Sequence, residues 1–153
     1  MIHGEITGEI IKGFYEVYNH LGYGFLERVY ENSLAIVLRR NGLYVIQQKP
    51  IHVRFDGTIV GEYFADVVVE DLVIVEIKSA KELAREHEAQ ILNYLKATRY
   101  EVGLLLNFGP VAGFERRVFE NLRKGTLAWL EGADADKRGP TRSDPQSSPY
   151  DKV

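Results

Sequence analysis

The spacing of apolar side chains predicts that the chain begins with two helices. The first apolar residues recur at steps of three and four positions, as one stripe of a helix does: Ile6, Ile10, Phe14, Val17 and Leu21. Thr7 is the expected cap of this helix, and the glycine-containing turn at 22–24 ends it. A second helix is predicted from Phe25 to Arg40, with four side chains facing inward: Leu26, Tyr30, Leu34 and Val37.

From residue 44 the apolar positions alternate with a period of two, which is typical of half-buried strands. The predicted strands are 44–48, 51–55, 58–69 and 72–78, with a hairpin turn at Asp56-Gly57. Residue preferences then favour a helix over 81–98, and the apolar run 102–106 suits a strand covered on both faces. Because a helix that joins two strands makes them parallel whereas hairpins are antiparallel, we expect a mixed β-sheet flanked by helices, of the α/β class.

The pattern weakens toward the C-terminus. A last strand over 114–119 and a short helix over 122–130 are the predicted elements there. Residues 132–153 hold three of the five prolines and almost no large apolar side chain. Such a segment buries too little apolar surface to offset the entropy of ordering it. We therefore expect a folded domain over 1–131 and a disordered C-terminal tail over 132–153.

Composition narrows the classes of protein that the chain fits. Its 153 residues suit one hydrophobic core, and 19 Lys and Arg against 22 Asp and Glu argue against binding nucleic acid through bulk charge alone. Local basic pairs such as Arg39-Arg40 and Arg116-Arg117 leave a basic patch open. The absence of cysteine excludes disulfides, thiolate zinc sites and thiol nucleophiles. Since no apolar run has the length of a membrane span and no secretory signal is visible, the expected compartment is the cytoplasm.

Two charged residues interrupt a strand that otherwise consists of Val and Ile. Glu76 and Lys78 lie two positions apart and share a face, where burial is costly unless the charges are paired or bind a metal. The register of the preceding hairpin decides whether Asp66 joins them. A three-residue turn puts Asp66 directly opposite Glu76, whereas a two-residue turn puts the two acids on opposite faces.

Two adjacent carboxylates at neutral pH share either a proton or a cation. Their hard oxygen ligands indicate Mg²⁺ or Mn²⁺, and Lys78 beside them would orient a water molecule or stabilise charge on a phosphate. Such a site hydrolyses phosphodiesters. The same residues also fit a simple Glu–Lys ion pair at the end of a strand, with Asp66 solvated at a sheet edge.

Further motifs favour the first interpretation. Residues 24–30, Gly-Phe-Leu-Glu-Arg-Val-Tyr, match the G-x-x-E-x-x-Y signature of the GxxExxY protein family, which is placed in the PD-(D/E)xK nuclease superfamily. Asp66, followed by Glu76-Ile77-Lys78, resembles the D…ExK core of that superfamily. Residues 90–94 resemble its Q-x-x-x-Y element, and 104–109 resemble the strand after it. The resemblance spans about 6–119 and implies a restriction-endonuclease-like core.

The resemblance also implies roles for individual residues. The implied metal ligands are Asp66, Glu76, the carbonyl of Ile77 and, directly or through a water molecule, Glu27. Lys78 would position or activate the attacking water, and Gln90 would hold Lys78 or a phosphate oxygen. Taken alone, Glu27 is also explained as an acid that the helix dipole favours in a first turn. Tyr30 and Tyr94 fit core aromatic residues with hydrogen-bonded hydroxyls better than catalytic groups.

These observations lead to one expected function and one alternative. The expected function is a Mg²⁺- or Mn²⁺-dependent nuclease that acts on DNA, with a homodimer as a candidate assembly and no membrane partner. The alternative is a nuclease-like fold that serves as a nucleic-acid-binding or protein-interaction module, with little or no turnover.

Overall fold

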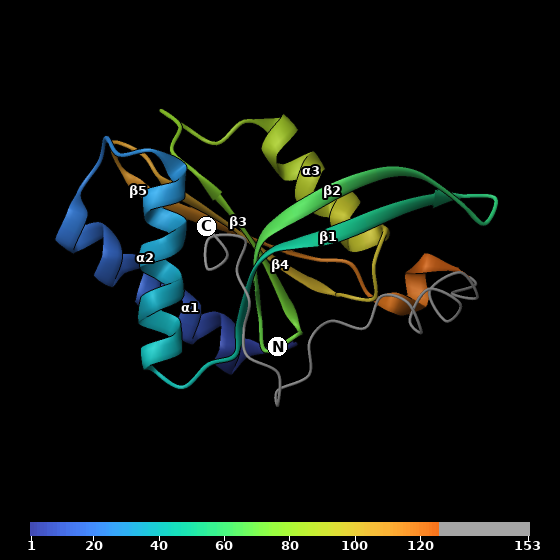
Figure 1. Ribbon diagram of the computed structural model, residues 1–153, viewed down its shortest axis with the longest axis horizontal. Coiled ribbons are helices and arrows are strands. Elements are labelled where there is room, and N and C mark those ends of the chain that lie inside the picture. The colour runs from blue at the N-terminus through green and yellow to red at the C-terminus, as the bar shows by residue number, and fades with distance from the viewer. Residues whose placement is uncertain (126–153) are drawn as a thin grey trace, which may run out of the picture.

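A five-stranded mixed sheet forms the centre of the protein, and its strands lie in the same order as in the sequence (Figure 1). The computed structural model describes residues 1–125. The strands are β1 (Val45–Phe55), β2 (Thr58–Val69), β3 (Val73–Lys78), β4 (Val102–Phe108) and β5 (Ala112–Val118). Only β3 and β4 are parallel, and the other neighbouring pairs are antiparallel. The predicted mixed α/β sheet is therefore confirmed.

Three helices cover the two faces of this sheet. Helices α1 (Gly4–Leu21) and α2 (Glu27–Arg40) pack on one face, where Phe14 and Leu34 share a buried core with Val75. Helix α3 (Arg85–Lys96) packs on the other face, where Leu95 lies in a second core with Ile74. Because β4 is covered on both faces, all of its residues are buried, as its continuous apolar run predicts.

The structure corrects the predicted ends of several elements. The two strands expected over 44–48 and 51–55 form one continuous β1, since Pro50 is tolerated on an edge strand that needs no outward hydrogen bond. Thr7 lies inside α1, where its hydroxyl donates to the carbonyl of Gly4, so it is not the cap. Leu26 precedes α2 and is 79% exposed, so its prediction as a core residue is wrong.

The hairpin of β2 and β3 separates into a fork. Three residue pairs join the two strands, Val69 with Val73, Val68 with Ile74 and Val67 with Val75, and the pairing ends there. Beyond that point β2 continues beside β1 alone, whereas β3 continues beside β4 to Lys78. Figure 1 shows the long β1–β2 hairpin running away from β3. The three-residue turn is thus the one adopted, and Asp66 and Glu76 stand opposite each other where the strands part.

The C-terminal predictions fall partly outside the described residues. Residues 121–124 form a short 3₁₀ turn at the start of the helix predicted over 122–130. The rest of that helix and the predicted tail over 132–153 lie beyond residue 125. None of the helices within residues 1–125 has both the length and the hydropathy needed to cross a bilayer.

Candidate active site at the fork between β2 and β3

The backbone of each strand binds the carboxylate of the other at the fork. Asp66 Oδ2 accepts a hydrogen bond of 2.8 Å from the Ile77 N–H, and Glu76 Oε1 accepts one of 3.3 Å from the Asp66 N–H. The ladder has ended here, so these N–H groups have no carbonyl of the opposite strand to bind and the carboxylates take its place. Both acids are therefore held side by side by the main chain.

Burial makes this carboxylate pair electrostatically costly. Glu76 is only 4% exposed, and burial raises its pKa well above the ordinary value. The negative charge of Asp66 raises the pKa of Glu76 further, while the positive charge of Lys78 acts in the opposite direction. A pair of this kind is stable at neutral pH only with a shared proton or a cation between the carboxylates. The atoms that the pair offers to a metal are all oxygens, so the pair fits a hard divalent ion such as Mg²⁺ or Mn²⁺.

Lys78 lies near the pair, and Glu27 contacts the backbone just after β3. Lys78 is half-buried at the end of β3, in register with Asn107 of β4. Glu27, in the first turn of α2, accepts a hydrogen bond of 3.2 Å from the Ser79 N–H just after β3. Among residues 1–125, no three acidic or histidine side chains are already gathered as a metal-binding cluster. The structure thus brings Asp66 and Glu76 together and places the Glu27 carboxylate on the backbone that follows β3.

Tyr30 explains the spacing of the G-x-x-E-x-x-Y signature. It is fully buried, and its ring stacks on Phe108 of β4. Its hydroxyl donates to the Gly22 carbonyl at 2.6 Å and accepts from the Phe25 N–H at 3.1 Å. One side chain therefore ties the loop before α2 to the core, and this loop leads directly into the first turn of α2, where Glu27 lies. The predicted role of Tyr30 as a core aromatic with a bonded hydroxyl is confirmed.

A second acid on α2, which the sequence analysis missed, faces the same fork. Glu31 is 3% exposed, and burial raises its pKa, with a further contribution from the nearby charge of Asp66. Its carboxylate accepts hydrogen bonds of 2.8 Å from both Gln47 and Gln48. Glu31 follows Glu27 by four positions, so the two side chains share one face of the helix. That spacing is the signal that could have identified it.

Gln48 links the two acids that surround it. Its side-chain amide donates to Glu31 Oε1 at 2.8 Å and to Asp66 Oδ1 at 3.2 Å. Its backbone has φ of +53°, the left-handed region that residues other than glycine rarely adopt. The pairing of β1 with β2 skips Gln48 while its neighbours Gln47 and Lys49 remain paired. Such strain persists where the surroundings enforce it and is frequent at functional sites.

The Q-x-x-x-Y element lies on α3, which packs on the sheet face opposite to that of α1 and α2. Gln90 donates a hydrogen bond of 3.0 Å to the hydroxyl of Tyr94, and Tyr94 is 5% exposed within the second core. Burial, followed by the negative charge of Glu76, raises the pKa of Tyr94 to about 12. The expected contact between Gln90 and Lys78 is not among the hydrogen bonds of residues 1–125.

Most of the predicted basic pairs are used within the fold. Arg40 bonds Glu16, Arg117 forms an ion pair with Glu88, and the Lys124 ammonium donates to three oxygens of its surroundings. They are consequently not free to form a continuous basic surface for a phosphate backbone.

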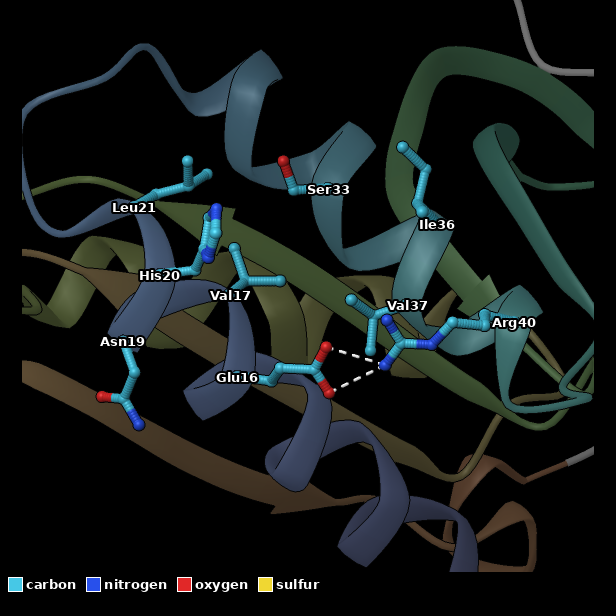
Figure 2. Close-up of a pocket in the computed structure, with 9 residues that line it drawn as sticks. All are labelled: Glu16, Val17, Asn19, His20, Leu21, Ser33, Ile36, Val37 and Arg40. Atoms are coloured by element: carbon cyan, nitrogen blue, oxygen red, sulfur yellow. Dashed lines mark hydrogen bonds and ion pairs between the residues drawn. The ribbon is translucent and has the colours of Figure 1, made fainter.

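A hollow of about 690 Å³ lies between α1 and α2, away from the fork (Figure 2). Its only acid, Glu16, is bound by both carboxylate oxygens to Arg40, at 2.9 and 2.7 Å. None of the residues predicted for the active site lines it. The fork, with its paired acids, is therefore the better candidate for catalysis.

A comparison with models of protein families supports the superfamily that the sequence motifs predict. A model described as the PD-(D/E)XK nuclease superfamily matches residues 4–118, and proteins of this superfamily are usually nucleases that use divalent metal ions such as Mg²⁺. One solved structure, the crystal structure of SSO0001, is 19% identical with a TM-score of 0.48; the match covers 76% of this chain and 61% of the length of that one. A search of curated proteins found no match. Membership in the narrower GxxExxY family stays a prediction. The family match, together with the mixed sheet and the acids at the fork, shows that the chain belongs to the PD-(D/E)XK nuclease superfamily.

Proposed function

We propose that this protein is a metal-dependent nuclease that hydrolyses phosphodiester bonds in DNA at the fork between β2 and β3. The observation that carries the proposal is the pair of Asp66 and Glu76 beside Lys78, in which the Ile77 N–H binds the Asp66 carboxylate and the Asp66 N–H binds the Glu76 carboxylate. An ion pair between one acid and Lys78 would not need a second acid beside the first. A cation-binding site does need a second acid, because its carboxylate supplies a further oxygen ligand.

The cation ligands that we propose are Asp66, Glu76 and the backbone carbonyl of Ile77. In an extended strand the N–H and C=O of one residue point to the same side, and the Ile77 N–H points to Asp66. The Ile77 carbonyl therefore has the direction that a third oxygen ligand needs. A divalent ion in this position supplies positive charge that polarises the phosphodiester and favours ionisation of water.

The remaining residues have supporting roles in the proposal. The Lys78 ammonium stabilises negative charge that develops on a phosphate oxygen, or orients the attacking water. Glu27 borders the cation site and adds negative charge to it, directly or through a water molecule. Gln90 holds Tyr94 in place and presents its remaining amide atoms to the substrate side of the fork.

The decisive experiment measures cleavage of single-stranded, double-stranded and branched DNA, and of RNA, with Mg²⁺ or Mn²⁺. Wild type is compared with Asp66→Ala, Glu76→Ala and Lys78→Ala, and Glu16→Ala in the other hollow is the matched control. We expect each fork variant to lose about 100-fold or more in rate and the control to keep wild-type activity. Metal-dependent cutting at one rate in all five proteins would identify a contaminating nuclease and refute the proposal.

One observation favours the alternative of a binding module without turnover: the Glu27 carboxylate bonds the backbone at Ser79 instead of joining the acid pair. Isothermal titration with Mn²⁺ separates the two functions. A nuclease binds the ion and loses binding in Glu76→Ala. A module binds DNA equally well with or without this substitution and takes up no Mn²⁺. Light scattering on the full chain tests the candidate homodimer.

A further inference from the structure

A groove of about 730 Å³ lies between the β1–β2 hairpin and α3. The hairpin contributes Arg54 and Tyr63 to its lining, and α3 contributes Gln90, Asn93, Tyr94 and Lys96. Figure 1 shows that the hairpin runs past α3 after it has left β3. The same departure of the hairpin that creates the fork therefore also creates this groove.

The groove lies on the same side of α3 as Tyr94, whose hydroxyl is within range of the charges at the proposed active site. Gln90 and Tyr94 line the groove, and Tyr94 is close enough to Glu76 and Asp66 for both charges to act on its hydroxyl. A polymer whose phosphate lies at the acid pair would thus have its neighbouring residues beside Tyr94. The groove is the path along which the chain of such a substrate can leave the fork.

The lining of the groove combines an aromatic ring, amides and cations. Tyr63 is 49% exposed, and its ring lies 5.8 Å from that of Tyr94. Asn93 is exposed on α3 and offers an amide to the groove. Arg54 and Lys96 have no ion-pair partner among residues 1–125, and Glu86 is the acid among the lining residues. The net charge of the lining is positive.

We propose that this groove binds an unpaired stretch of the nucleic acid next to the scissile phosphate, with one base stacked on Tyr63. The inference rests on the proposed nuclease function and names its substrate class. A base can stack on the Tyr63 ring only when it is not paired inside a duplex. Arg54 and Lys96 supply charge for the adjacent phosphates. The volume is within the range of sites that enclose small ligands, which suits one or two nucleotides and not a duplex.

The test measures binding, so that it does not depend on turnover. A short fluorescein-labelled oligothymidylate and the matching duplex are titrated with the full-length protein in EDTA, and fluorescence anisotropy reports binding. We expect the single strand to bind more tightly than the duplex. Tyr63→Ala should weaken single-strand binding about 5- to 100-fold, whereas Tyr63→Phe should preserve it, because the ring provides the stacking. Tyr15→Ala, a partly exposed tyrosine on α1, is the control.

The contributions of Arg54 and Lys96 are measured separately, through the salt dependence of binding. Arg54→Gln and Lys96→Gln should each lower the slope of log affinity against log salt by about 0.7, the value for one phosphate contact on a single strand. Equal affinity of wild type and Tyr63→Ala, or tighter binding of the duplex, would overturn the inference. Mn²⁺ binding and cleavage by wild type would then still support the nuclease. Conversely, tight single-strand binding without metal uptake would retain the groove and remove the catalytic function.

Discussion

The amide of Gln48 donates a hydrogen bond to Asp66 although the Gln48 backbone has left the regular strand conformation. With φ of +53°, Gln48 points its side chain between the carboxylates of Asp66 and Glu31. The irregular backbone of β1 at Gln48 thus allows its side chain to bind Asp66 on the neighbouring strand β2. We interpret Gln48 as a positioning residue that orients Asp66 for cation binding.

Replacement of Gln48 by glycine tests the role of the side-chain amide separately from that of the backbone conformation. Glycine adopts the left-handed conformation without strain, so Gln48→Gly keeps the chain path but removes both hydrogen bonds. We expect Mn²⁺ affinity to fall about tenfold or more, as measured by isothermal titration, because the support of a ligand is lost. Asp56→Gly at the hairpin turn relaxes an equal φ of +53° far from the acids and should leave the affinity unchanged. Unaltered Mn²⁺ binding by Gln48→Gly would rule out the positioning role.

Glu76→Gln should stabilise the metal-free protein at neutral pH. The pKa of Glu76 is raised in the folded state, so the folded protein keeps a proton that the unfolded chain releases as pH rises above about 4.5. Wild-type stability in EDTA therefore declines from that pH upward, and the glutamine variant lacks this contribution. Denaturant midpoints at acidic and neutral pH measure the difference, with Glu16→Gln as the control. Mg²⁺ should raise the denaturant midpoint of wild type but not that of Glu76→Gln. In EDTA at neutral pH, a midpoint of Glu76→Gln below that of wild type would contradict this account.

Tyr30→Phe tests how the loop before α2 is held. The substitution removes the hydroxyl that bonds the Gly22 carbonyl and the Phe25 N–H and leaves the buried ring in place. Both partners then lack a hydrogen bond, so we expect a loss of about 1–3 kcal/mol of unfolding free energy. Hydrogen exchange of the Phe25 amide should accelerate, whereas Tyr15→Phe should change neither quantity. Unchanged exchange at Phe25 would show that the loop is held by other contacts.

Gly109→Ala should be strongly destabilising, for a reason of space. A Cβ atom at this position would lie 2.2 Å from the Ala80 carbonyl oxygen, in the segment that follows β3. Asn107 holds that segment by accepting from the Ala80 N–H and donating to the Ala80 carbonyl. Overpacking here should cost about 3 kcal/mol, seen as a lower denaturant midpoint.

Gly8→Ala is the matched control for this prediction. Gly8 lies exposed within α1 with no atom within 4 Å of the added methyl, so alanine should stabilise the protein by about 0.5–1 kcal/mol. Equal effects of the two substitutions would contradict the steric explanation.

The sequence identified Asp66 and Glu76 as a candidate pair because alternation along a strand is a local property. Val67, Val69, Val73 and Val75 are buried together, and the three-residue turn brought Asp66 opposite Glu76 as one of the two considered registers requires. It did not choose between those registers, since the turn residues suit both. The sequence also missed Glu31 and Gln48, whose importance arises only where α2 meets β1.

The amino-acid pattern alone determined the order of helices and strands, the mixed sheet, and the candidate residues Asp66, Glu76 and Lys78. Periodicity, and charges within an apolar strand, can be recognised without coordinates. The tertiary structure decided how these residues are used. The β2–β3 ladder stops after three residue pairs, and this early end opens the fork, turns backbone N–H groups onto carboxylates and separates the hairpin from α3 to form the groove. Where a ladder ends depends on the packing of both sheet faces, and such contacts join residues that are distant in the chain.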